Sequence, residues 1–252
     1  MQRTALVTGA TAGFGAAICR TLIENGYRVI GTGRRVARLE QLQQELGETF
    51  HFRAFDISDL QATEDAFHSL PANWQSIDLL VNNAGLALGL ESADKANLDD
   101  WMQMSDTNSN GLVTITRLVL PQMVERNSGH IINLGSIAGT YPYPGGNIYG
   151  GTKAFIKQFS LNLRADLAGT QIRVTNVEPG LCGGTEFSNV RFKGDDARAE
   201  KLYENVEYVS PQDIANIVLW LNQQPEHVNI NRIEVMPTAQ TFAPLNVARI
   251  QK

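Results

Sequence analysis

Tyr149 and Lys153 are four residues apart in a stretch whose pattern predicts a helix from Tyr149 to about Leu167. Four residues make about one helical turn, so both side chains would lie on one face, with the ammonium close to the phenol oxygen. A neighbouring cation favours the phenolate of tyrosine, whose ordinary pKa is about 10. Tyr149 is therefore a candidate proton shuttle, with Ser136 thirteen residues upstream. The same spacing also occurs at the start of ordinary amphipathic helices.

A glycine-rich turn follows the first predicted strand, Thr4–Thr8, and precedes a predicted helix from about Gly13 to Asn25. Glycines in such a turn let backbone N–H groups approach a pyrophosphate, which the positive end of the helix also attracts. The glycine spacing differs from Gly-x-Gly-x-x-Gly, so a plain helix-entry turn is the alternative. The predicted dinucleotide-binding turn comprises Gly9, Ala10, Thr11, Ala12, Gly13, Phe14 and Gly15.

Arg34 and Arg35 follow the second predicted strand, where an NAD-dependent enzyme would carry an acidic residue for the ribose hydroxyl. Gly33 leaves the preceding position without a side chain, and two guanidinium groups suit the 2′-phosphate of NADP. The alternative is that both arginines are merely solvated at a helix start, although cations there oppose the helix dipole. The sequence thus predicts NADP as the cofactor.

Strand and helix patterns alternate along the chain without an internal repeat or a linker. Such alternation predicts a single α/β domain, residues 1–252, with a Rossmann-like, doubly wound parallel sheet of about seven strands and helices on both faces. A ligand crevice is then expected at the carboxyl ends of the strands. The predicted strands are 4–8, 27–32, 49–55, 78–81, 129–134, 171–177 and 230–235, and the predicted helices are 13–25, 35–46, 110–126 and 149–167.

The composition narrows the class of protein. With 43% hydrophobic residues among 252, the chain can bury a sizeable core, and its net charge of -5 argues against binding of nucleic acid or membrane surfaces. Its two cysteines and four histidines lack disulfide-scaffold or metal-ligand spacing, so no metal is expected. No apolar stretch reaches the roughly 18 residues that a membrane span needs, and the first residues lead directly into a strand. We therefore expect a cytoplasmic protein.

Five motifs together resemble the short-chain dehydrogenase/reductase family: Thr8–Gly15, Asn82–Gly85, Ser136, the Tyr149/Lys153 pair and Pro179–Gly180. The resemblance covers about residues 4–247 and implies an oxidoreductase. It implies that Ser136, Tyr149 and Lys153 are catalytic. It also implies a catalytic asparagine near the start of the long helix, which matches Asn108, with Asn110 as the competing candidate.

The same resemblance implies further contacts with the cofactor. Asp56 and Ile57 would contact the adenine, and Asn83 would lie against the ribose. Tyr149 and Lys153 would also touch the cofactor. The segment expected to wrap the nicotinamide comprises Pro179, Gly180, Leu181, Cys182, Gly183, Gly184, Thr185, Glu186 and Phe187.

Three stretches, 85–89, 143–147 and 178–195, resemble more closely the members of the family that use NADP to oxidise small 3-hydroxy acids. This likeness implies hydride transfer at the 3-hydroxyl carbon of L-allo-threonine, serine or 3-hydroxypropionate, and reduction of malonic semialdehyde. The alternatives are a reductase of a 3-oxoacyl thioester, sugar or steroid, and a catalytically silent NADP-binding protein. All four positions expected to be catalytic, 108, 136, 149 and 153, carry the residue types that the family resemblance implies. This argues against a catalytically silent protein.

The stretch 186–207 mixes charged and aromatic residues, as expected of a lid over the site. Within it Arg191 is a better candidate than Lys193 for the substrate carboxylate, because a guanidinium can bind a carboxylate bidentately. Ser136 and Tyr149 would then bind the substrate hydroxyl. The alternative is that Arg191 pairs on the surface with Asp195 or Asp196.

The helix of 149–167 carries two apolar arcs. The wide arc contains Phe155, Ile156, Phe159, Leu163 and Leu167, and the second contains Ala154, Leu161 and Ala165. One arc can face the sheet and the other a partner subunit, or the helix can be buried within one chain. The family resemblance implies a homotetramer in which this helix lies between subunits.

Overall fold

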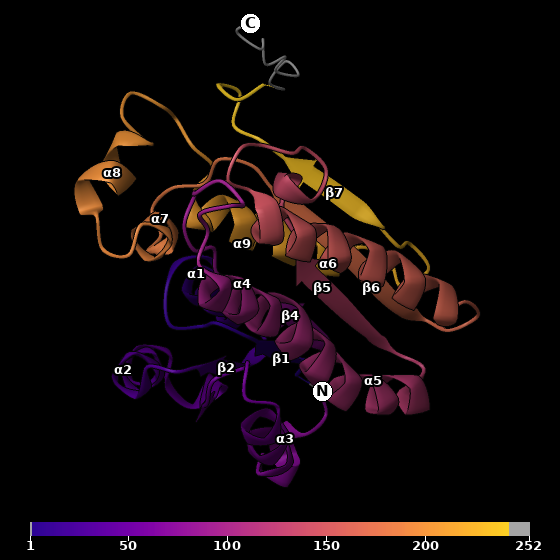
Figure 1. Cartoon of the computed structure of the whole chain (residues 1–252). Coiled ribbons are helices and arrows are strands. Elements are labelled where there is room, and N and C mark those ends of the chain that lie inside the picture. Colours follow the sequence, from indigo (N-terminus) through magenta and orange to yellow (C-terminus); the bar gives the residue numbers. More distant parts are fainter. Residues whose placement is uncertain (1, 242–252) are drawn as a thin grey trace, which may run out of the picture.

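A computed structural model describes residues 2–241. Its core is a seven-stranded sheet in the order β3-β2-β1-β4-β5-β6-β7, with every neighbouring pair parallel (Figure 1). The strands are β1 Thr4–Val7, β2 Arg28–Gly33, β3 Phe50–Ala54, β4 Leu79–Asn82, β5 Gly129–Leu134, β6 Ile172–Pro179 and β7 Arg232–Val235. The predicted fold class and all seven predicted strands are confirmed, and no strand end differs from its predicted position by more than two residues.

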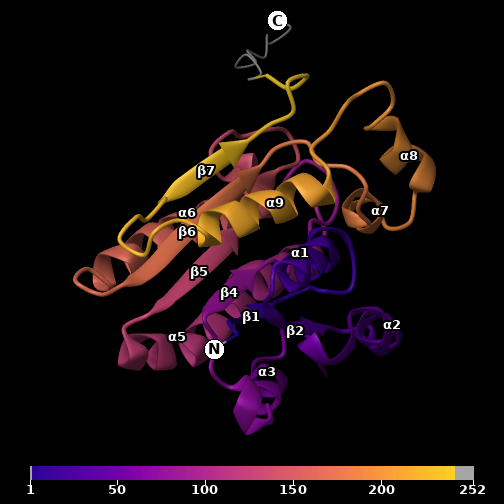
Figure 2. The same ribbon diagram turned by 180° about the vertical axis from the view of Figure 1, so that it is seen from behind.

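Helices cover both faces of the sheet (Figures 1 and 2). The longer helices are α1 Gly13–Glu24, α2 Val36–Leu46, α3 Leu60–His68, α4 Leu98–Ser105, α5 Gly111–Arg126, α6 Asn147–Asp166 and α9 Pro211–Asn222. Short helical turns lie at Gly47–Thr49, Ala72–Trp74, Asp106–Asn110 and Ile137–Gly139, and the helices α7 Phe187–Arg191 and α8 Asp196–Lys201 follow β6.

Two hydrophobic cores lie on opposite sides of the sheet. On one side α1, α2 and α9 pack on the strands, with Ile18 and Val218 fully buried. On the other side α5 and α6 do so, with Val119 fully buried. Phe155 of α6 departs from its predicted arc, because it is 42% exposed whereas Ile156 is buried.

Three of the longer helices, α3, α4 and α9, lie outside the predicted ranges, and each of these begins with a side-chain cap. Asp59 accepts from the backbone N–H of Ala62 at the start of α3. Asn97 caps α4, and Ser210 forms a capping box with Asp213 at the start of α9. These caps satisfy N–H groups that a helix start otherwise leaves without partners.

The sheet order fixes where a ligand can bind. The chain runs outward from β1 to β3 and then returns to place β4 on the other side of β1. Such a reversal opens a crevice at the carboxyl ends of the strands. Loops after β1, β4, β5 and β6 therefore meet at one edge.

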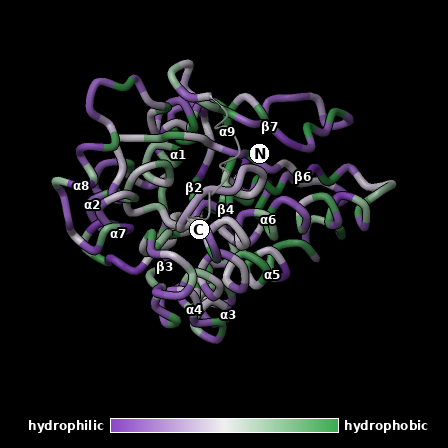
Figure 3. The backbone as a smooth tube through the Cα atoms, turned by 45° about the horizontal axis from the view of Figure 1, so that its top comes forward, coloured by the Kyte–Doolittle hydropathy of each residue, from purple (hydrophilic) through white to green (hydrophobic). Residues whose placement is uncertain are grey.

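A projecting segment after β6 contains α7 and α8, drawn in orange in Figures 1 and 2. It carries both hydrophilic and hydrophobic residues (Figure 3). This segment coincides with the lid predicted at 186–207. That lid, and a single domain over residues 1–252, stay predictions, and residues 242–252 lie outside the described part. Within residues 2–241 no helix combines the length and hydrophobicity that crossing a membrane requires.

Candidate active site

Tyr149 and Lys153 lie in the first turns of α6, and both are buried. The Lys153 ammonium donates a hydrogen bond to the backbone carbonyl of Leu134 at 2.8 Å, and its Nζ lies 5.7 Å from the centre of the Tyr149 ring. Burial lowers the pKa of Lys153 to about 8. The two residues share a helix face as predicted, but the lysine is directed at the end of β5.

Burial raises the pKa of the Tyr149 phenol above its ordinary value, and a hydrogen bond with the Ser136 side chain and the charge of Arg191 oppose that rise. The expectation that Lys153 holds this pKa low is therefore wrong for this arrangement. Desolvation of the phenolate outweighs the opposing effects, and Arg191 is the cation whose charge lowers the pKa of the phenol. The raised pKa favours the protonated phenol.

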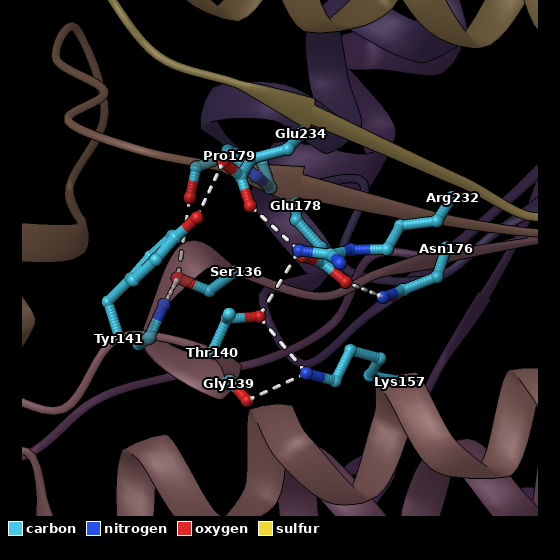
Figure 4. Close-up of polar contacts among 11 residues, drawn as sticks. Ser136, Gly139, Thr140, Tyr141, Lys157, Asn176, Glu178, Pro179, Arg232 and Glu234 are labelled. Carbon is cyan, nitrogen blue, oxygen red and sulfur yellow. Dashed lines mark hydrogen bonds and ion pairs between the residues drawn. The ribbon is translucent and has the colours of Figure 1, made fainter. Parts of the chain in front are cut away.

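Ser136 lies just beyond the end of β5, beside Tyr149. Its hydroxyl oxygen accepts from the backbone N–H of Ala138 at 3.1 Å, and the hydroxyl donates weakly to the carbonyl of Pro179 at 3.4 Å (Figure 4). Ser136 therefore joins the ends of β5 and β6 at the position where the substrate hydroxyl is expected.

A buried ion pair fixes the end of β6. Glu178 is 1% exposed and accepts from Asn176 at 2.7 Å and from Arg232 of β7 at 2.7 Å (Figure 4). A buried carboxylate without such a partner would be strongly destabilising. The backbone at Pro179, which Ser136 contacts, is thereby held against β7.

Asn108 is fully buried in the π-helical turn Asp106–Asn110. Its side chain exchanges two hydrogen bonds of 2.9 Å with the backbone of Leu86 and donates to the Thr152 hydroxyl at 3.1 Å. Asn110 is exposed and donates to Asp106 at 2.8 Å. Of the two candidates, the structure therefore brings Asn108 next to α6 and the Lys153 side of the site.

The glycine-rich turn has the shape that a close approach to phosphate needs. Gly9 and Gly13 have positive φ angles of 69° and 52°, a region that side chains disfavour. A Cβ on Gly15 would collide with the carbonyl of Gly9. Ala12 caps α1 without a side-chain hydrogen bond, so the first N–H groups of α1 remain available to an anion. The turn fits a dinucleotide pyrophosphate.

Asn83 supports this turn. Its amide donates to the carbonyls of Thr8 and Gly9 at 2.8 and 3.2 Å, which ties the end of β4 to the end of β1. Ala10, Thr11 and Phe14 complete the turn. Asp56, near the end of β3, accepts from the backbone and hydroxyl of Ser58. Ile57 follows it and is buried.

The two predicted phosphate-binding arginines differ in their surroundings. Arg35 donates to the Thr11 hydroxyl at 2.9 Å and forms an ion pair of 2.7 Å with Glu186, both side chains being 45% exposed. Arg34 is 60% exposed and lies 3.4 Å from Asp56. A Cβ on residue 33 would lie 2.7 Å from the Thr11 methyl group, so Gly33 also serves close packing.

The loop after β6 spans the crevice from the sheet to the glycine turn. Gly180 donates to the carbonyl of Val235 at 2.7 Å, and Thr185 packs on Gly13. Burial raises the pKa of Cys182 to about 12, so its thiol is neutral. The loop ends at Phe187, whose ring centre lies 5.8 Å from that of Tyr149. Leu181, Gly183, Gly184 and Glu186 complete it.

Arg191 points into the site. Its Cζ lies 5.6 Å from the centre of the Tyr149 ring, and it donates to the Tyr143 hydroxyl at 2.7 Å. The alternative of a surface pair with Asp195 or Asp196 is not found, because Asp195 caps α8 and Asp196 accepts from Asn189.

Lys193, the other candidate cation of the lid, is exposed and pairs with Asp100 of α4 at 2.8 Å. Tyr143, Gly89 and Thr152 were not among the predicted site residues. Gly89 and Tyr143 lie in stretches that the sequence singles out, and Thr152 lies between Tyr149 and Lys153, but only the folded chain brings them beside Arg191 or Asn108.

The comparisons agree with this site. The family model described as short chain dehydrogenase matches residues 3–196. A "Probable NADP-dependent dehydrogenase" of Haemophilus influenzae is 74% identical over 98% of both chains. The "NADP-dependent 3-hydroxy acid dehydrogenase YdfG" of Escherichia coli is 59% identical over 97% of this chain and 98% of its own.

Among solved structures, "The Closed form of serine dehydrogenase complexed with NADP+" superposes with a TM-score of 0.97 at 59% identity, covering 98% of this chain and 100% of the other. The chain belongs to the short chain dehydrogenase family. The predicted family is thereby confirmed, and the predicted cofactor and substrate class agree with the names of these relatives.

Proposed function

We propose that the protein is an NADP-dependent dehydrogenase that oxidises the 3-hydroxyl group of small 3-hydroxy acids. Serine, L-allo-threonine and 3-hydroxypropionate are of this class, and malonic semialdehyde is the corresponding oxo acid in the reverse direction. The observation that carries the proposal is the Arg191 guanidinium 5.6 Å from the ring of Tyr149. This proximity supports a role for Arg191 in binding the carboxylate next to Tyr149 as the proton-transferring group, as a short hydroxy acid requires.

In the proposed reaction, residues of this chain bind the substrate and transfer its proton, and the bound NADP cofactor supplies the hydride acceptor. Tyr149 takes the proton of the substrate hydroxyl, and Ser136 holds the same oxygen by a hydrogen bond. Loss of the Tyr149 proton is opposed by burial and favoured by the charge of Arg191. Asn108, linked through Thr152 to α6, supports proton exit on the Lys153 side.

The cofactor-binding residues are part of the same proposal. The turn 9–15 would hold the pyrophosphate, and Arg34 and Arg35 the 2′-phosphate. Asp56 and Ile57 would contact the adenine, Asn83, Tyr149 and Lys153 the ribose side, and the loop 179–187 would cover the nicotinamide. The uncapped start of α1 and the side-chain-free Gly15 support the pyrophosphate position.

We also propose a cytoplasmic homotetramer that binds neither nucleic acid nor membranes. Exposed apolar residues on neighbouring helices support assembly, with Phe155 and Leu161 of α6 each 42% exposed and Met102 of α4 55% exposed. Covering such residues with a second copy removes apolar surface from water. A molar mass from light scattering that corresponds to a monomer at micromolar concentration would overturn the proposed homotetramer.

A single assay tests the function. The protein is mixed with NADP and either 3-hydroxypropionate or 1,3-propanediol, which replaces the carboxylate by a neutral hydroxymethyl group. We expect NADP reduction with the acid at a kcat/KM at least tenfold higher than with the diol. Equal rates, or turnover only of thioesters, sugars or steroids, would refute the proposal.

A further inference from the structure

Tyr143 lies on a rigid turn in front of α6. Prolines at 142 and 144 flank it, and Gly146 donates its backbone N–H to the Tyr143 carbonyl at 3.0 Å. Gly145 has a positive φ of 78°. Proline followed by a glycine of positive φ is typical of a type II turn. The backbone at Tyr143 is therefore held in a defined turn, and its ring packs against Gly146.

The Arg191 guanidinium is held by this ring and by the loop after β4. Nη2 donates to the Tyr143 hydroxyl at 2.7 Å, and Nε donates to the Gly89 carbonyl at 3.3 Å. Gly89 in turn donates its N–H to the Arg191 carbonyl at 3.0 Å. Cζ lies 5.4 Å from the Tyr143 ring centre and 5.6 Å from that of Tyr149. Both ends of Arg191 are thus fixed.

Two hydrogen-bond donors remain at this point. Among residues 2–241, no acceptor contacts Nη1 of Arg191. The Tyr143 hydroxyl accepts from Arg191, which leaves its own O–H to donate, and no acceptor within the same residues receives it. Both side chains are half-buried. Adjacent donors of this kind, one of them charged, suit an anion.

We propose that Tyr143 is a further substrate-binding residue, whose hydroxyl donates a hydrogen bond to the same carboxylate that the Arg191 guanidinium binds. This inference rests on the proposed function and goes beyond it by assigning a second ligand to the acid group. Accepting from Arg191 while donating to the carboxylate, Tyr143 also orients the guanidinium.

The length of the substrate follows from the same contacts. Tyr149 and Ser136 hold the 3-hydroxyl end, and one methylene separates the reacting carbon from the carboxylate carbon of a 3-hydroxy acid. The Arg191 guanidinium lies over the Tyr149 ring and donates to the Tyr143 hydroxyl, so a carboxylate bound by both residues lies close to the reacting carbon. Lys193 does not compete, because it is engaged with Asp100.

The test uses the full chain with saturating NADP and compares Tyr143→Phe with wild type on 3-hydroxypropionate and 1,3-propanediol. Loss of one hydrogen bond to a charged group should lower kcat/KM for the acid about ten- to a hundredfold, chiefly through KM. The diol should change less than about threefold, because it lacks the charge. Tyr141→Phe is the matched control, since that hydroxyl bonds to Glu234 at 3.2 Å.

A double-mutant cycle tests whether Tyr143 and Arg191 bind the same substrate carboxylate or whether each substitution lowers activity independently. Arg191→Leu should remove most of the preference for the acid, and adding Tyr143→Phe should then cost little more. Direct binding of 3-hydroxypropionate to the protein–NADPH complex, measured below the melting temperature of each variant, should weaken in parallel with KM.

Equal losses for acid and diol in Tyr143→Phe, or independent losses in the cycle, would overturn the role of Tyr143. A wild-type protein that shows no preference for the acid would instead overturn the proposed function. The two failures are therefore distinguishable.

Discussion

The ammonium of Lys153 is bound to the backbone carbonyl of Leu134 at 2.8 Å, and the residue is buried with a pKa of about 8. This lysine therefore loses its proton near physiological pH, whereas an exposed lysine does so near 10.4. Its charge is complete well below pH 8 and declines as the pH rises through that value.

The first prediction concerns NADP binding and pH. Because the charged lysine should bind the cofactor ribose, the Kd for NADP should rise above pH 8, by at most about tenfold per pH unit for one proton. Isothermal titration at pH 7 to 9.5 would measure this. Lys153→Met should bind weakly and without that dependence, and Lys157→Met, one turn along α6, should behave as wild type. A Kd independent of pH in the wild type would contradict the prediction.

Removal of the phenol oxygen should abolish chemistry and spare binding. Tyr149→Phe keeps the ring that packs on Phe187, so its Kd for NADP should change little, while kcat with 3-hydroxypropionate falls by about three orders of magnitude or more. Steady-state kinetics and fluorescence titration give the two numbers. A variant that kept a tenth of the activity would sink the assignment of Tyr149.

Arg34 is expected to carry cofactor preference. Its guanidinium is 60% exposed and paired only loosely with Asp56, so a 2′-phosphate can bind it. Arg34→Ala should lower the NADP-to-NAD ratio of kcat/KM about tenfold or more without abolishing turnover with NAD. Arg20→Ala is the control, because Arg20 lies on α1 in a bidentate pair with Glu45. Similar effects of both substitutions would indicate that Arg34 acts only through the overall positive charge near the cofactor and does not bind the 2′-phosphate.

Glu186 should compete with the cofactor phosphate for Arg35. Their ion pair of 2.7 Å is 45% exposed on each side, and such pairs contribute at most about 1 kcal/mol. Glu186→Gln should therefore tighten NADP binding by no more than about fivefold and leave NAD unchanged. Glu45→Gln serves as the control. Weaker NADP binding in Glu186→Gln would show that the carboxylate instead orients Arg35.

The sheet was predictable because buried parallel strands produce short apolar runs that end in glycine or a polar residue. Helices α3 and α4 were not, since α3 buries only Thr63 and α4 only Met104, which leaves almost no apolar stripe. By contrast, α9 carries a Ser-Pro-x-Asp start that the sequence displays. A Ser-Pro start with Asp at the third helical position is the local signature of a capped helix.

Local spacing likewise predicted part of the site. Tyr149 and Lys153 share a face because four residues separate them, but the partner of the lysine comes from β5, nineteen residues away. The contact of Arg191 with Tyr143 spans 48 residues, and that of Arg35 with Glu186 spans 151. Such partners depend on the packed fold, so no pattern within a single segment could show them.

Gly33 limits how the cofactor preference can be redesigned. Introducing an aspartate for the NAD ribose would put a Cβ 2.7 Å from the Thr11 methyl group, and the Thr11 hydroxyl is held by Arg35. An engineer who changes position 33 alone would therefore distort the phosphate-binding turn before gaining affinity for NAD. A change of cofactor preference would therefore require two substitutions together: a smaller residue in place of Thr11 and an aspartate in place of Gly33.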